Sequence, residues 1–142
     1  LGQLLLHAFR WFDQSLLATL TARGWQEISQ AQSNNFANIG MSQGLRISEL
    51  ARQIGVSRQA VHKSVNELKE MGLLELVPDP TNRSAKRVVL TPQGQRNVVA
   101  ALTIFADLEA QLARRLGAEK VAALRQVLEM DWGEPATLHA TR

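Results

Sequence analysis

Cysteine is absent from the 142 residues of this chain, which excludes disulfides, thiolate metal sites and the sensing of peroxide through a thiol. No apolar run approaches the roughly 18 residues that a membrane-spanning helix requires. The three leucines at residues 4–6 lack the basic flank and the cleavage site of a signal peptide. We therefore expect a cytoplasmic protein that does not bind a membrane.

Signatures of catalysis are also missing. The three histidines, His7, His62 and His139, are far apart in the sequence. No Ser-His-acid set, carboxylate pair, zinc-ligand spacing or phosphate-binding glycine loop occurs in a supporting context. The sequence therefore predicts no enzyme activity, no metal site and no cofactor.

The charge is unevenly distributed. The hydrophobic content of 45% is that of a globular domain, and the net charge is only +3. Residues 46–96 contain nine Lys or Arg and five Asp or Glu, a net charge of +4, whereas the rest of the chain has a net charge of −1. This basic segment is a candidate for binding nucleic acid.

Two short amphipathic helices are predicted at the start of the basic segment. The first covers residues 47–54, with Ser48 as its expected N-cap and a glycine as its stop. Ser57 is expected to cap the second, over residues 58–71. The turn between them has three residues, so the helices must cross steeply, as in a helix-turn-helix that reads DNA.

The exposed N-terminal half of the second helix offers groups that can bind base edges in the major groove of DNA. They are guanidinium, amide, imidazole and ammonium groups, which include hydrogen-bond donors and acceptors. A solvated helix face with a basic composition is the alternative. The expected DNA-binding residues of this helix are Ser57, Arg58, Gln59, His62 and Lys63.

A hairpin is predicted next. Residues 73–77 and 87–90 are rich in branched apolar side chains, and the two prolines between them predict a loop over residues 78–86. A thin, basic protrusion of this kind can follow the phosphate backbone or place an arginine in the minor groove. The expected contacts come from Arg83, Lys86 and Arg87.

Residues 46–94 resemble the DNA-binding core of the MarR family of bacterial regulators. The order is helix, Gly-Val-Ser, recognition helix, Gly-Leu-Leu, wing and Leu-Thr-Pro-Gln-Gly. The wing is similar to the family signature Asp-Pro-x-Asp-Arg-Arg at residues 79–84, but Asn82 replaces an aspartate that braces the wing arginine, and Ser84 replaces the second arginine. The resemblance implies a mainly α-helical fold with a small β-hairpin wing, a winged helix-turn-helix with N- and C-terminal dimerisation helices.

Four segments are expected from these patterns. They are an N-terminal dimerisation helix with a second helix (1–45), the winged core (46–91), C-terminal dimerisation helices (92–131) and a frayed tail (132–142). Apolar stripes lie on more than one side of the terminal helices, which favours a homodimer over a thick monomer core. The expected interface residues are Leu5, Phe9, Phe12, Leu16, Leu102, Phe105, Leu112, Leu116, Leu124 and Leu128.

A small ligand is implied by the resemblance alone. Members of the resembled family often bind phenolic or other aromatic anions beside the dimerisation helices. The expected pocket residues are His7, Trp11 and Phe36, although a tryptophan on an amphipathic helix is more often part of an interface. The polar segment 28–39 is either a solvated helix or loop, or a source of amides for a ligand cavity or for phosphates.

These observations together predict a dimeric, sequence-specific repressor of transcription that binds a near-palindromic operator in double-stranded DNA. The alternative is a winged-helix module that assembles with an acidic protein partner. A gel shift in competitor DNA distinguishes the two.

Overall fold

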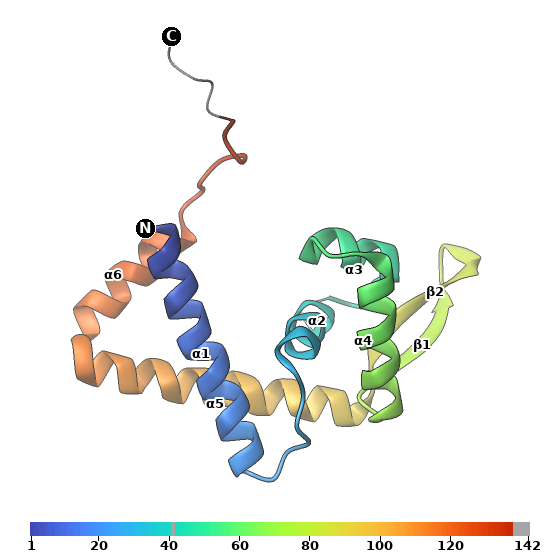
Figure 1. Cartoon of the computed structure of the whole chain (residues 1–142), viewed down its shortest axis with the longest axis horizontal. Coiled ribbons are helices and arrows are strands. Elements are labelled where there is room, and N and C mark those ends of the chain that lie inside the picture. Colours follow the sequence, from blue (N-terminus) through green and yellow to red (C-terminus); the bar gives the residue numbers. More distant parts are fainter. Residues whose placement is uncertain (41, 138–142) are drawn as a thin grey trace. The chain divides into compact units, whose positions relative to one another are not determined.

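The computed structural model describes residues 1–40 and 42–137 and consists of two units, Leu1–Ala106 and Asp107–Arg142. The mainly helical fold with one β-hairpin is confirmed (Figure 1). No described helix has both the length and the apolar character needed to cross a bilayer. In chain order the elements are α1 (Gly2–Ala22), α2 (Gln30–Gly40), α3 (Ile47–Ile54), α4 (Arg58–Glu70), β1 (Leu74–Asp79), β2 (Asn82–Leu90), α5 (Pro92–Leu116) and α6 (Ala118–Glu129).

The hydrophobic core of the first unit lies among α2, α3, α4 and the hairpin. One face of α4 supplies Val61, Val65 and Leu68, all fully buried, at the spacing that the sequence predicts for the inner face of this helix. Each such side chain contributes roughly 1.5–3 kcal/mol relative to an exposed one. Because this face is fixed in the core, the opposite face of α4 must point into solvent.

Most of the polar segment forms helix α2. Its start is a reciprocal cap, in which the N–H of Gln32 donates to Ser29 Oγ at 3.2 Å and the N–H of Ser29 donates to Gln32 Oε1 at 2.8 Å. Phe36 is only 6% exposed and belongs to the core. This position departs from the prediction that Phe36 lines a ligand pocket, because the aromatic ring is already covered by its own chain.

The helix caps agree with the sequence in part. Ser57 Oγ accepts a hydrogen bond from the N–H of Ala60 at 3.2 Å, which confirms the predicted N-cap of α4. The prediction for α3 was wrong, since its N-cap is Arg46 and the helix begins at Ile47. The N–H of Arg46 donates to Glu49 Oε2 at 2.9 Å, so Ser48 is left in the first helical turn.

The hairpin has longer strands than the sequence predicts. The pairing runs from Leu74 with Leu90 to Pro78 with Lys86, and the turn lies between Asp79 and Asn82. Most of the predicted loop at 78–86 is therefore strand. Pro78 is tolerated because β1 has only one neighbouring strand, so its missing N–H breaks no sheet hydrogen bond on the open side.

The start of α5 is attached to the end of α4 through Thr91. The N–H of Thr91 donates to the carbonyl of Leu73 at 3.1 Å, and its hydroxyl donates to the carbonyl of Gly72 at 2.6 Å. Thr91 Oγ1 also accepts from the N–H of Gly94 at 3.0 Å, so Thr91 is the N-cap of α5. A Cβ atom on Gly94 would lie 2.1 Å from the carbonyl oxygen of Leu73, so this junction requires glycine.

Helix α1 buries part of its apolar stripe within its own chain. Leu16 is 4% exposed, and the rings of Phe12 and Phe105 lie 6.3 Å apart. Leu16 was predicted to lie in a dimer interface, but it has almost no surface left for a partner. The carboxyl group of Asp13 is also buried on this helix, and burial raises its pKa.

The second unit contains the last turns of α5 and helix α6. Arg125 of α6 forms an ion pair with Glu109 of α5 and a second with Glu129 at 3.5 Å. The indole N–H of Trp132 donates to the carbonyl of Val127 at 3.0 Å and so covers the end of α6. No residue of α6 is buried. Of the predicted tail, residues 138–142 lie outside the described residues.

Candidate nucleic-acid interface

The solvent face of α4 carries the predicted base-reading side chains. Arg58, Gln59, His62 and Lys63 are all exposed. Residues four apart lie on the same side of a helix, so Arg58 and His62 form one side of this face, and Gln59 and Lys63 form the other. Both sides project from the N-terminal half of the helix, the half that a recognition helix presents to bases.

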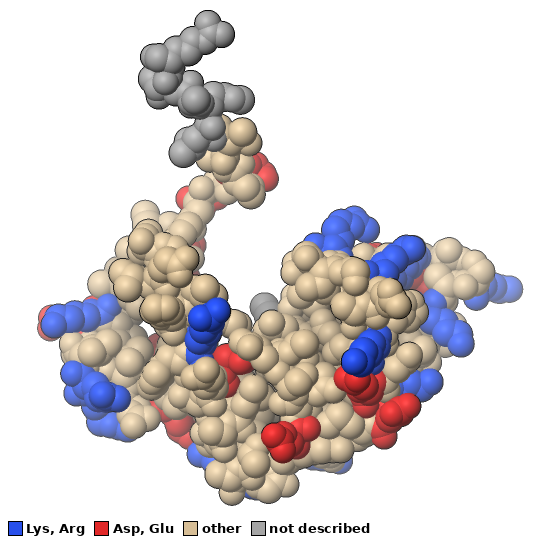
Figure 2. Space-filling view, in the orientation of Figure 1, with Lys and Arg blue, Asp and Glu red and all other residues tan. Residues whose placement is uncertain are grey.

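One acidic side chain of α4 is engaged by α2. Gln32 Nε2 donates to Glu67 Oε2 at 2.8 Å. This bond gives one of the amides in the polar segment a role that the sequence did not predict, as it holds a carboxylate at the far end of α4. On the face seen in Figure 2, Lys and Arg side chains are scattered over the region of α3, α4 and the wing, and Asp and Glu side chains lie near the end of α4.

The turn of the wing is fixed to the start of α3. Arg46 Nε donates to Asp79 Oδ2 at 2.6 Å, and Arg46 Nη2 donates to Thr81 Oγ1 at 3.2 Å. Asp79 Oδ1 accepts from the N–H of Thr81 at 2.8 Å and from its hydroxyl at 2.7 Å. These bonds, the one from Arg46 first, hold the pKa of Asp79 far below its usual range. The carboxylate is therefore charged at neutral pH and braces the wing.

Asn82, which stands where the family signature has an aspartate that braces the wing arginine, bonds to Ser84 instead. Asn82 Oδ1 accepts from the N–H of Ser84 at 3.1 Å and from its hydroxyl at 2.7 Å. The two departures from the family signature thus bind each other. Arg83 is exposed.

The cations of β2 differ in their surroundings. Lys86 is exposed, as predicted for a DNA contact. Arg87 is half-buried, and its Nη2 donates to the carbonyl of Gly44 at 2.7 Å, beside the bridge between Leu45 and Val88. This bond departs from the predicted DNA contact, because the guanidinium is used to hold the segment before α3 against the hairpin.

A groove of about 440 Å³, here called the basic groove, lies between the wing, the start of α3 and α4. Three of its lining residues are Lys or Arg, one is His62 and none is acidic. Arg46 and Ser48 were not expected to take part, since no local pattern links residues 46–48 to the wing. The lining residues are Arg46, Ile47, Ser48, Arg58, His62, Leu76, Ala85 and Lys86.

The remaining ligand residues lie on α1. His7 is exposed, and Trp11 is half-buried with its ring edge-on to that of Phe12 at a centroid distance of 4.9 Å. Another hollow of the first unit has a volume of about 600 Å³ and contains neither residue. It is lined by Trp25, Pro92, Gln95, Arg96, Val99 and Ala100. Among the described residues, no three His, Asp or Glu side chains converge to form a metal site.

Several of the predicted interface residues of the first unit are exposed. Phe9 of α1 is 47% exposed and Leu102 of α5 is 62% exposed, large values for apolar side chains. Leu5, Phe12 and Phe105 are half-buried. The sequence did not single out Val99, which lies one turn before Leu102 and is equally exposed.

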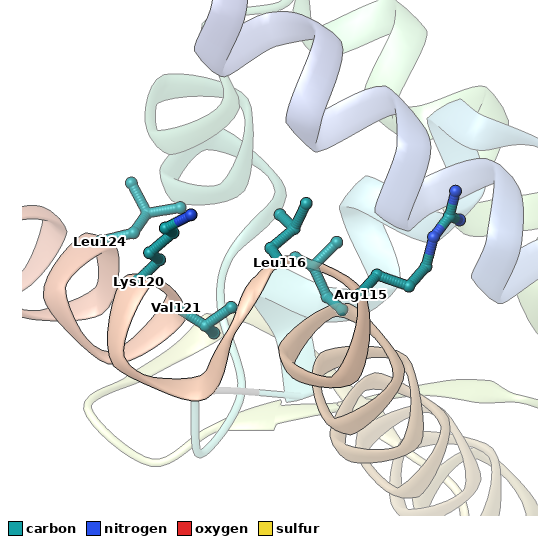
Figure 3. A pocket seen from close by; sticks show the side chains of 6 residues that line it. Arg115, Leu116, Lys120, Val121 and Leu124 are labelled. Atoms are coloured by element: carbon teal, nitrogen blue, oxygen red, sulfur yellow. The ribbon is translucent and has the colours of Figure 1, made fainter.

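The second unit presents its own apolar side chains at the corner between α5 and α6. Leu116, Leu124 and Leu128 are about half exposed, and Leu116 and Leu124 point to the same side of the corner (Figure 3). They border a hollow of about 350 Å³. Its lining residues are Leu112, Arg115, Leu116, Lys120, Val121 and Leu124.

Sequence comparison finds a family and distant relatives. The model of the MarR family matches residues 28–83. Curated relatives include uncharacterized proteins of Mycobacterium tuberculosis and Mycobacterium bovis, each 32% identical over 92 residues, which are 61% of this chain and 64% of the relative. The match thus spans less than two thirds of the length of these relatives.

Solved structures match nearly the whole chain. The apo form of wild-type MarR from E. coli is 25% identical, with a TM-score of 0.75 over 91% of this chain and 94% of that chain. The transcriptional regulator Tm0710 of Thermotoga maritima is 23% identical, with a TM-score of 0.67 over 90% of this chain and 88% of that chain. MepR, a transcription regulator of the Staphylococcus aureus multidrug efflux pump MepA, is 21% identical, with a TM-score of 0.70 over 89% of this chain and 92% of that chain. Residues 28–83 thus match the MarR family, and the chain, with its braced wing beside an exposed basic helix, has the fold of the MarR-family winged-helix transcription regulators.

Proposed function

We propose that this protein is a homodimeric, sequence-specific DNA-binding regulator of transcription, acting in the cytoplasm as a repressor. The observation that carries the proposal is the exposed N-terminal half of α4, with amide, imidazole and cationic groups beside a braced basic wing. The core of its own chain holds α4 in place, so these groups are presented on a rigid element. A related structure is described as the Multiple Antibiotic Resistance Repressor, which supports the choice of repressor.

The dimer is proposed from the apolar side chains that the terminal helices leave exposed. Each unit exposes large apolar side chains, Phe9 and Leu102 in the first and Leu116, Leu124 and Leu128 in the second. A two-fold dimer buries these side chains and supplies a second recognition helix. The operator is then a near-palindrome whose half-sites lie about 10 base pairs apart.

Selection of binding sites from random duplex DNA tests the proposal. The full chain is expected to recover one near-palindromic sequence, and sedimentation at micromolar concentration is expected to show a dimer. Recovery of no sequence, together with binding to an acidic protein, would favour the alternative of an assembly module. The selected operator also identifies which genes the protein regulates, and transcription in vitro from such a promoter separates a repressor from an activator.

Control by a small aromatic anion is the second part of the proposal. His7 and Trp11 lie one turn apart on α1, so an imidazole and an indole share one side of the helix. An aromatic acid such as benzoate is expected to quench tryptophan fluorescence and to weaken operator binding. Trp11→Phe should remove both effects, and a Trp25→Phe control should retain them. Unchanged quenching in Trp11→Phe places the ligand elsewhere.

A further inference from the structure

The basic groove holds an excess of positive charge that the protein itself does not neutralise. Arg58 of α4 and Lys86 of β2 come from different elements and line the same hollow. Within residues 1–40 and 42–137, neither side chain forms an ion pair or a hydrogen bond. The third cation, Arg46, is different, because Asp79 neutralises it from the inner side. Two unpaired cations in one hollow repel each other and favour the binding of an anion.

The other groups of the groove suit a small oxyanion. Ser48 and His62 add a hydroxyl and an imidazole on the walls, and Leu76 and Ala85 leave part of the lining apolar. A volume of about 440 Å³ admits a compact group. A phosphodiester projects from the DNA backbone as a tetrahedral anion with charged oxygens, and Arg, Lys and Ser are common partners of such oxygens.

The groove also separates the two sides of α4. Arg58 and His62 line it, facing the wing, whereas Gln59 and Lys63 lie outside it on the other side of the helix. A side chain that lines a hollow beside the wing is poorly placed to contact a base edge at the floor of the major groove. The sequence alone assigned all four side chains to base reading, because a helical pattern cannot show which of them the wing covers.

We propose, on the basis of the proposed DNA-binding function, that the basic groove binds one phosphate oxyanion of the DNA backbone in each half-site. Arg58 and Lys86 hold the oxyanion from two sides, with Ser48 and His62 as further partners. Gln59 and Lys63 then read the bases. One phosphate held between wing and helix fixes the register of α4 along the duplex.

A chemical double-mutant cycle tests this division. The selected operator is synthesised with one uncharged methylphosphonate at a time along a half-site, and each duplex is bound to the wild type and to Arg58→Gln/Lys86→Gln. We expect one position at which the neutral group weakens wild-type binding but leaves the double variant unaffected. The double variant should lose affinity equally for operator and random duplex. Raising the salt from about 50 to 200 mM should lower its affinity less than that of the wild type, and the difference should be about 3.5-fold for each half-site.

Matched variants provide the controls. Lys69→Gln removes one positive charge from an exposed position at the far end of α4 and should keep the methylphosphonate effect. Gln59→Ala should also keep it while losing discrimination between operator and random duplex, since one base contact is removed. Circular dichroism of each variant checks that the fold is retained.

Two results would overturn the inference. One is a double variant that is as sensitive as the wild type to every methylphosphonate. The other is a double variant that loses operator affinity alone, at one base pair and with unchanged salt dependence, because that result assigns Arg58 to a base. Failure of the wild type to prefer any sequence would instead count against the proposed function itself.

Competition by inorganic phosphate against DNA binding, compared with competition by chloride at equal ionic strength, gives the source of the anion. If phosphate competes more strongly than chloride, and this extra competition disappears in the double variant, the groove also binds free phosphate. If there is no extra competition but the methylphosphonate effect is present, only the DNA backbone supplies the oxyanion.

Discussion

The contact between Gly94 and Leu73 predicts that replacing a helical glycine by alanine will destabilise this protein. Helix propensity alone predicts the opposite, since alanine in place of glycine favours a helix by about 1 kcal/mol. The added Cβ would lie 2.1 Å from the carbonyl oxygen of Leu73, and a contact under 3.0 Å forces a shift. The obstacle is backbone rather than a flexible side chain, so the start of α5 must move by about 1 Å.

That movement disrupts the hydrogen bonds that attach α5 to the end of α4. The bond from the N–H of Thr91 to Leu73 and the cap on Gly94 are worth about 1 kcal/mol each. The free energy lost with these two bonds exceeds the gain in helix propensity, and overpacking adds a further destabilisation. We expect Gly94→Ala to lower the free energy of unfolding by about 1–3 kcal/mol.

Urea denaturation at matched protein concentration, followed by circular dichroism, measures this difference. Gly2→Ala is the control, because Gly2 also lies in the first turn of a helix and a Cβ there has no neighbour within 4 Å. The control should be unchanged or slightly more stable. A Gly94→Ala variant as stable as the wild type would show that the junction between α4 and α5 yields easily, and the close-contact argument would fail.

Three further predictions concern a buried hydroxyl, the wing and the dimer. Ser64→Ala should raise the free energy of unfolding by up to about 1 kcal/mol in urea, because Ser64 Oγ is buried without a partner in the described structure; a loss would reveal a hidden partner. Because the pKa of Asp79 is lowered in the folded protein, its carboxylate stabilises the fold above the ordinary carboxyl pKa near 4, and this stability is lost as the pH falls toward the pKa in the folded state. Asp79→Asn should therefore have a lower free energy of unfolding at neutral pH, and that free energy should depend less on pH in acid. Parallel pH profiles of the variant and the wild type would contradict the brace. Leu102→Asp, at an exposed position, should sediment as a folded monomer and bind the operator weakly; an intact dimer would remove Leu102 from the interface.

Local patterns in the sequence predicted the elements around α4 well. Ser57 and Thr91 act over three residues, so their capping roles could be read from the sequence, and the apolar spacing of Val61, Val65 and Leu68 gave the buried face. The strand ends were misplaced because Pro78 suggested a loop, although a hairpin with an open edge accepts proline.

Contacts between distant residues could not be predicted in this way. Arg46 and Asp79 are 33 residues apart, and Arg87 and Gly44 are 43 apart. Sequence periodicity describes neighbours along one element, whereas these pairs depend on how α3 and the hairpin pack. The same limit explains why Phe36 was assigned to a ligand pocket and Leu16 to a dimer interface, since an apolar residue in a helix does not reveal which partner covers it.

The bridge between Leu45 and Val88 bears on how the wing avoids self-association. A two-stranded hairpin has two open edges, each of which can pair with a strand from another molecule. Leu45 exchanges backbone hydrogen bonds with Val88 at 2.8 and 3.2 Å and so occupies the outer edge of β2 near its base. On β1, Pro78 has no N–H to offer, and Glu75 is exposed and charged. Both edges are thus poor templates for a further strand, so several copies at high local concentration can extend their wings without polymerising through them.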